Sequence, residues 1–138
     1  MYATVEDFVS RIGELETIEL TDPDALGVVN ESILRVALSD ASSQIDGYLG
    51  RYRLPLTNVP KNLTRICCDI ARYHLAGKSS KTMTEDLENR YKLCIKELEN
   101  ISKGVVSLGV DLVDSSEQGE NTVSFFAGSK RIWGGTRR

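Results

Sequence analysis

Metal or nucleophilic chemistry in this chain of 138 residues would have to come from Cys67, Cys68, Cys94 and the single histidine, His74. Cys67 and His74 fall in one stretch with helical periodicity. On a helix they would be about 10.5 Å apart along the axis, which is too far for two ligands of one zinc ion. Adjacent Cys67 and Cys68 point to different sides of a helix. We therefore expect all three cysteines to be small buried hydrophobic residues, and no disulfide.

The spacing of the polar residues is not typical of a catalytic site. A serine or cysteine hydrolase needs a base beside its nucleophile, whereas His74 is expected to help build the inward face of its helix. The carboxylates Asp7, Asp40, Asp46 and Asp69 are scattered rather than paired, and the glycines form no phosphate-binding loop. We expect a protein that is not an enzyme and that needs no metal or cofactor.

The last ten residues, SKRIWGGTRR, place four basic side chains beside Trp133. Cations next to an aromatic ring are a common way of holding single-stranded nucleic acid. The pI near 5.2 argues against a dedicated DNA-binding domain, and no predicted helix has a clustered basic face. A small DNA-binding regulator is an alternative, but sequence-specific DNA binding is not favoured.

Charge is distributed unevenly along the chain. Residues 1–50 contain ten acidic residues against two basic ones, whereas residues 51–138 contain fifteen basic residues against ten acidic ones. Such polarity suits head-to-tail contacts between identical copies, although a segregated surface can also simply be solvated. The start, MYATVEDF, lacks the features of a signal peptide, and no apolar run is long enough to span a membrane. We expect a chain made in the cytoplasm, with no membrane partner.

Apolar residues recur at helical spacing in three long stretches and one short one. They predict helices near residues 4–12, 31–49, 61–76 and 83–103. Thr4 and Asn30 are expected as N-caps, Thr82 is expected to open a capping box with Glu85, and Gly50 is expected to stop the second helix. The expected core is Leu38, Ile45, Ile66, Ile70, Tyr91, Cys94 and Leu98.

The segments between these helices are expected to be irregular. Residues 14–30 contain Pro23 and Gly27 and little periodicity, which predicts a loop with about one turn of helix. Pro55 and Pro60 predict a structured bend before the third predicted helix, because each proline forces its predecessor into an extended conformation. The prediction is a mainly α fold: a small bundle of three long helices and one short N-terminal helix, over residues 1–104.

Residues 105–138 are expected to form an extended C-terminal arm of β type. VVSLGVDLV and TVSFFAG have strand character, and the polar spacer DSSEQGEN separates them. A strand without a partner in its own chain is marginal. The arm could fold onto the bundle as a hairpin or could add as a strand to a neighbouring protein.

Several blocks of the sequence resemble a known family. They are MYATVEDFVSRIGELE, LTDPD, ALSDASSQIDGYLGRYRLPLTNVPKNL, CDIARYHL and RYKLCIKELENISKGVVSLG, which occur in one collinear order over about residues 1–110. Together they are similar to the small virion proteins of Mu-type phages and prophages that are encoded downstream of the major capsid protein. That family is in turn remotely similar to the head-tail connector, or adaptor, proteins of long-tailed phages.

The resemblance implies a structural protein of the phage neck. Connector subunits are helical bundles that form a ring, usually of twelve copies, beneath the portal, and continue the DNA channel. The implied partners are further copies of the chain, the portal protein and other neck or tail-completion proteins, and DNA passes without sequence-specific binding. The implied location is the virion neck, after assembly in the host cytoplasm. A tail-completion or stopper protein of the same neck is the alternative within this class.

The resemblance also marks two blocks of residues, neither of which looks catalytic. The first block is Asp40, Ile45, Asp46, Tyr48, Leu49, Arg51, Tyr52, Leu54, Pro55 and Leu56; the second is Asp69, Ile70, Ala71, Arg72 and Tyr73. Asp46 and Asp69 are candidates to pair with Arg51, Arg53 or Arg72 and so to hold the two-proline bend, although solvated charges are an equal alternative.

The arm supplies the candidate docking residues. If TVSFFAG adds to a partner as a strand, alternate side chains face opposite sides, so that only one of Phe125 and Phe126 can anchor it. Ile132 and Trp133 would fill a second pocket, and the basic residues would meet an acidic rim. The full candidate set is Val123, Phe125, Phe126, Lys130, Arg131, Ile132, Trp133, Arg137 and Arg138.

Overall fold

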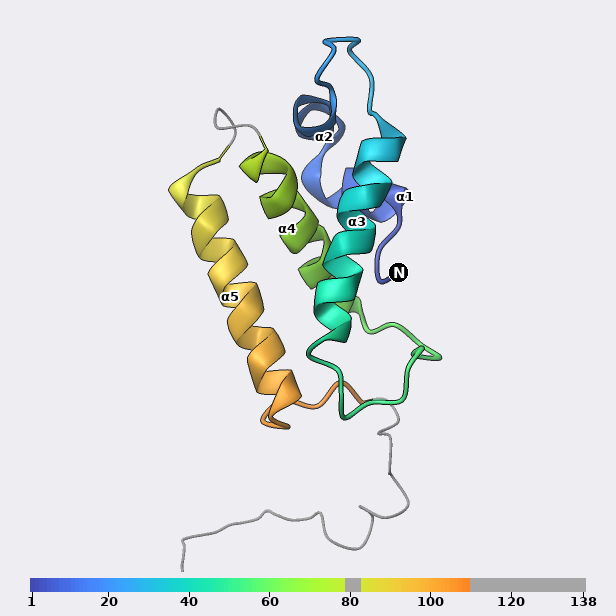
Figure 1. Cartoon of the computed structure of the whole chain (residues 1–138), viewed down its shortest axis with the longest axis vertical. Coiled ribbons are helices and arrows are strands. Elements are labelled where there is room, and N and C mark those ends of the chain that lie inside the picture. Colours follow the sequence, from blue (N-terminus) through green and yellow to red (C-terminus); the bar gives the residue numbers. More distant parts are fainter. Residues whose placement is uncertain (79–82, 110–138) are drawn as a thin grey trace, which may run out of the picture.

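The structure, a computed structural model, describes residues 1–78 and 83–109 as a bundle of α helices (Figure 1). The helices are α1 (Val5–Ile12), α2 (Glu14–Thr21), α3 (Glu31–Asp46), α4 (Lys61–Gly77) and α5 (Glu85–Ser102). The described residues contain no strand, and the prediction of a small, mainly α bundle is confirmed. Most of the predicted arm, residues 110–138, lies outside the described residues.

The bundle is organised around α4. This helix packs against both α3 and α5, and it lies between them in Figure 1. The two short helices pack on each other and against α3 and α4, toward the N-terminal end of α3. The loop of residues 22–30 therefore lies at one end of the bundle, and the bend of residues 47–60 lies at the other (Figure 1).

Two of the predicted helix starts are confirmed in atomic detail. Thr4 Oγ1 accepts a hydrogen bond from the Asp7 amide (3.1 Å), and the Asp7 carboxylate accepts one from the Thr4 amide (3.0 Å), which is a capping box. Asn30 Oδ1 caps α3 by accepting from the Ile33 amide (3.1 Å). These contacts satisfy amides that have no partner within the helix.

Two predicted boundaries are shifted. Helix α3 ends at Asp46 with Gly47 as its C-cap, a few residues before the predicted stop at Gly50. Thr84 caps α5 by accepting from the Leu87 amide (3.2 Å), whereas the predicted cap, Thr82, lies outside the described residues. Ser and Thr residues are close together here, so the capping pattern alone could not place the start to within two residues.

The prediction of a loop directly after Gly13 is wrong, because α2 occupies residues Glu14–Thr21. Its buried face consists of Thr17, Leu20 and Thr21, so two of its three buried positions hold polar residues and the apolar spacing typical of a helix is missing. Thr17 Oγ1 donates to the Gly13 carbonyl (2.7 Å), and Thr21 Oγ1 donates to the Thr17 carbonyl (2.8 Å). Each buried hydroxyl is thereby satisfied within the helix.

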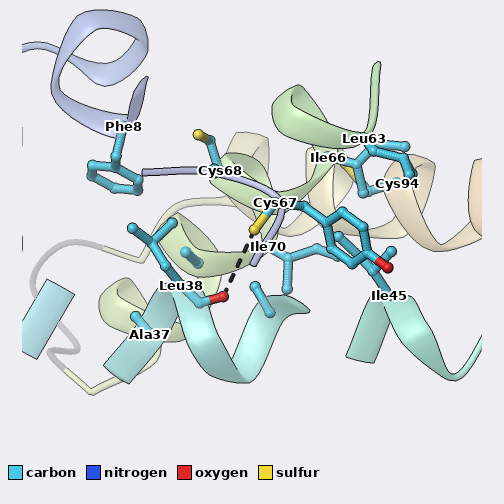
Figure 2. Close-up of a cluster of buried hydrophobic side chains, with 14 of the residues drawn as sticks. Phe8, Ala37, Leu38, Ile45, Leu63, Ile66, Cys67, Cys68, Ile70 and Cys94 are labelled. Atoms are coloured by element: carbon cyan, nitrogen blue, oxygen red, sulfur yellow. Dashed lines mark hydrogen bonds between the residues drawn. The ribbon is translucent and has the colours of Figure 1, made fainter. Parts of the chain in front are cut away.

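The core fills the space around α4 and confirms the predicted stripes of the long helices. Figure 2 shows Phe8 from α1, Leu38 from α3 and the side chains of α4 converging. Cys67 points toward the carbonyl of Leu38, to which its thiol donates at 3.7 Å. Tyr91 is the exception among the predicted core residues, since it is only partly buried. The largest fully buried side chains are Phe8, Leu34, Leu38, Ile45, Leu49, Leu63, Ile66, Ile70, Leu75, Leu98, Ile101 and Thr17.

Ile70→Ala and Leu98→Ala are each expected to lower the free energy of unfolding by about 2–5 kcal/mol, because both side chains are fully buried and their removal leaves a cavity. Leu93→Ala on the outer face of α5, where the side chain is 64% exposed, is the matched control and should change it by under about 0.5 kcal/mol. Equilibrium denaturation measures all three. Equal effects at the three positions would show that the packing described above is wrong.

Candidate interaction surfaces

A polar cluster ties the three long helices together. Gln44 of α3 donates from Nε2 to the Tyr91 hydroxyl of α5 (2.9 Å), and its Oε1 lies 3.1 Å from His74 Nε2 of α4. Because a carbonyl oxygen only accepts, His74 Nε2 carries the hydrogen. Tyr73 stacks on Tyr91 with ring centroids 3.9 Å apart. The cluster joins α3 to α5 across α4, and it occupies His74 in a structural role.

The predicted ion pairs between the two family blocks do not form. Asp46 accepts a hydrogen bond from the hydroxyl of Tyr2, a buried residue of the N-terminal segment, and burial together with that carboxylate raises the pKa of the phenol. Asp69 lies 3.7 Å from Arg65, one helical turn away, and accepts from the Cys94 thiol at 3.7 Å. Tyr2 and Cys94 reach these carboxylates only in the assembled fold, whereas Arg65 is a local partner at i, i+4 spacing on the same helix.

Two ion pairs hold the outer helices onto α4. Arg72 Nε donates to Glu16 Oε2 of α2 at 2.6 Å, and Arg65 Nη2 lies 2.9 Å from both carboxylate oxygens of Glu97 in α5. The side chains are partly exposed, so each pair adds little stability by itself. Their main effect is to fix how α2 and α5 lie on α4.

The bend is anchored to the end of α5. Tyr52 is buried, and its hydroxyl accepts a hydrogen bond from the amide of Leu108 (3.2 Å). Gly104, which follows α5, has a φ of +81°, and the guanidinium of Arg51 occupies the position that a Cβ atom would take there. A cation at the C-terminal end of a helix also complements the helix dipole. The bend is therefore held by contacts with the segment that follows α5 rather than by the predicted carboxylates.

The two family blocks thus divide between core and surface. Ile45, Leu49, Tyr52, Ile70 and Ala71 are buried; Tyr48, Arg51, Leu56, Asp69, Arg72 and Tyr73 are half-buried; and Asp40, Asp46, Leu54 and Pro55 are exposed. Most of the blocks therefore serve packing and helix-to-helix contacts. Three of the exposed residues, Asp46, Leu54 and Pro55, help to form the first of two surface features.

The first feature is a hollow beside the bend, which we call the bend hollow. It has a volume of about 340 Å³ and is lined by Met1, Tyr2, Asp46, Leu54, Pro55, Leu56 and Val59. Leu54 and Val59 are each 41% exposed at its rim. Residues 51–61 contain Arg51, Arg53 and Lys61 but no acidic residue. The hollow itself is lined by apolar residues and by the carboxylate of Asp46, and the chain segment that supplies Leu54 and Val59 is basic.

The second feature is the loop of residues 22–30, which we call the tip; the sequence predicted a loop here but not an interaction surface. Asp22 accepts from the amides of Leu26 (2.8 Å) and Gly27 (2.7 Å), and the Asn30 amide donates to Thr21 Oγ1 (3.1 Å). These bonds close the loop while Leu26 remains 72% exposed. The available signal was the TDPDALG sequence, in which an aspartate precedes amides that it can bind and apolar residues follow.

The cysteines are placed as the sequence predicts, as free and buried thiols. Burial raises the pKa of Cys68 and that of Cys94 to about 12, and it also raises the pKa of Cys67. Within residues 1–78 and 83–109, no three His, Cys, Asp or Glu side chains are grouped as metal ligands would be. The searched helices include none that is long and apolar enough to cross a membrane. The nine candidate docking residues of the arm, Val123 to Arg138, lie outside the described residues.

The fold and its surfaces define a small helical bundle in which the described histidine and cysteine side chains serve packing and helix contacts. A sequence model of the family described as Bacteriophage Mu, Gp36 matches residues 2–126. The chain belongs to this family. The match extends beyond the resemblance over residues 1–110 and includes the TVSFF segment of the arm.

Two relatives agree with this assignment. The Mu-like prophage FluMu protein gp36 of Haemophilus influenzae is 38% identical over 138 residues, which cover 97% of this chain and 93% of the relative. Gene product J of Escherichia phage Mu is 37% identical over 125 residues, which cover 88% of this chain and 86% of the relative. Both relatives are similar along nearly their whole length, so the comparison concerns the entire bundle.

His74 should make stability depend on pH. Burial lowers its pKa from the ordinary value of 6.5, so the unfolded chain binds a proton more readily than the folded one. The neutral ring stabilises the fold above pH 6.5, and this contribution is lost as the pH falls below that value. His74→Gln should therefore show a shallower loss of unfolding free energy between about pH 6.5 and 5. Denaturation curves at several pH values measure this, and parallel profiles would contradict it.

Proposed function

We propose that this protein is a subunit of the phage neck, a head-tail connector or adaptor that forms a ring under the portal and continues the DNA channel. Its membership of the Mu Gp36 family and its fold as a small helical bundle support the proposal. The function rests on surfaces, and the protein is not an enzyme. The ring would consist of about twelve copies, as in the connectors to which the family is remotely similar.

The observation that carries the proposal is the placement of exposed apolar side chains at the two ends of the bundle. Leu26 and Val28 are exposed at the tip, and Leu54 and Val59 are exposed at the bend. Exposed apolar groups gathered beside charged groups are typical of contact sites between proteins. A subunit with two different contact surfaces can bind a neighbour on each side, which a ring requires.

The most direct test is the location of the protein in the particle. An image of the neck of a Mu-type virion should show density for this bundle as a ring between the portal and the tail. Particles produced without the protein should contain separate heads and tails. Density further along the neck, where it closes the channel, would assign the stopper or tail-completion role instead. Joined particles without the protein would overturn both assignments.

The C-terminal arm is proposed to dock on the portal or on a neighbouring subunit, with Phe125 or Phe126 as its apolar anchor. A chain truncated after Gly119 should keep the helical circular dichroism and the thermal midpoint of the full chain, because the core described here ends before it. The same truncation should fail to join heads to tails in an assembly assay. Loss of the helical signal would show that the arm belongs to the bundle, and normal joining would show that it is dispensable.

DNA is proposed to pass this protein without being bound by it. The first fifty residues carry ten acidic side chains against two basic ones, and acids facing the channel would repel a duplex. We expect the purified protein to show no shift of duplex DNA in a gel at physiological salt. Submicromolar binding that depends on the DNA sequence would instead favour the small DNA-binding regulator.

A further inference from the structure

We propose that the tip of one subunit, residues 22–30, docks in the bend hollow of the next copy of this chain. This inference deepens the proposed function. Only the closing of the contacts into a ring rests on that function. It names the two surfaces of the contact and assigns a second copy of the chain as the occupant of the hollow.

The tip is built to present apolar side chains in a fixed shape. Its two anchors are Thr21, whose hydroxyl is buried and accepts from the Asn30 amide, and Asp22, whose carboxylate accepts from two loop amides. Leu26 is 72% exposed and Val28 57% exposed on this closed loop. A loop that is already ordered loses little conformational entropy on binding, which favours association.

The bend hollow has matching properties. Its lining combines the exposed apolar residues Met1, Leu54 and Val59 with Tyr2 and the carboxylate of Asp46, so an apolar side chain entering it would be removed from water in part by apolar groups. Its floor is fixed by the bond between Tyr2 and Asp46. The exposed apolar side chains of the tip and those beside the hollow would both be removed from water by such a contact.

Charge distinguishes the two surfaces and specifies how they pair. Residues 22–30 contain Asp22 and Asp24 and no basic residue, whereas residues 51–61 carry Arg51, Arg53 and Lys61 against one carboxylate of the hollow, Asp46. Two tips would repel each other, as would two bends, but a tip and a bend attract. The pairing is therefore head to tail and not symmetric.

The positions of the surfaces explain why such contacts would propagate. The tip precedes α3 and the bend follows it, and the helix spans about 24 Å at 1.5 Å per residue. A subunit that binds one neighbour through its tip leaves its bend free for another. Heterologous contacts of this kind close into a ring or continue as a filament. A single small contact is weak, and ring closure strengthens it because the last contact is intramolecular.

The test uses the full chain and three matched double variants. The tip variant is D24R/L26S, and the bend variant is R53D/V59S. The control, E88R/L93S, makes the same kinds of change as the tip variant on the exposed outer face of α5. Circular dichroism and the thermal midpoint establish that each variant is folded. Sedimentation velocity over a concentration series, at low and high salt, then measures association.

The wild type and the control should associate as concentration rises, and added salt should weaken this association. The tip variant and the bend variant should each remain monomeric, since each lacks one half of the contact. Mixed in equal amounts, these two variants should form a dimer and nothing larger, because only one intact tip can meet one intact bend.

Three results with these proteins would overturn the tip-to-bend contact, and a fourth comes from the truncated chain. They are a wild type that stays monomeric across the series, association of either variant alone to the wild-type extent, and loss of association in the folded control. If truncation after Gly119 abolishes association while the tip variant keeps it, the hollow belongs to the arm and the inference is wrong. None of these outcomes decides the proposed function, which fails separately if heads and tails join without the protein.

Discussion

The fold depends on the burial of α4 on most of its circumference. Eight of its residues are buried, among them the adjacent Cys67 and Cys68, which leave the helix in different directions. A helix with apolar residues on more than one face is not stable when only one face is covered. Helices α3 and α5 both pack along it, and α1 and α2 complete the cover at one end. The small volume of the two cysteines suits positions where several helices approach the same segment.

Much of this arrangement could be predicted from the sequence, because α3, α4 and α5 carry apolar residues at regular spacing. Helix α2 could not be recognised in the same way, since Thr17 and Thr21 occupy its buried face and their hydroxyls bond within the helix. The sequence also could not predict which polar side chains pair with each other. Asp46 binds Tyr2, and Arg72 binds Glu16, over separations of 44 and 56 residues that only the assembled fold brings together.

Polar side chains between the described helices serve the same constraint. Gln44, His74 and Tyr91 join three helices, while Arg65 and Arg72 attach α5 and α2 to α4. The single histidine and the three cysteines, the residues that offered chemistry in the sequence, are thereby used in packing or helix contacts. Sequence reasoning anticipated this for the cysteines from their spacing. It could not anticipate the Gln44 contact, because helical spacing does not specify which face of α3 meets α5.

Both surface loops take their shape from the same core. Thr21 is buried beside the tip and joins the backbone of α2 at Thr17 to the end of the tip at Asn30, and Tyr52 is buried within the bend and bonds to the segment after α5. Each loop is thus held by a side chain inserted into the bundle, and its exposed apolar residues stay in place without help from a partner. Helix α3 fixes the separation of the two loops. The packing around α4 therefore determines the folded bundle and also the spacing and orientation of the surfaces through which it can assemble.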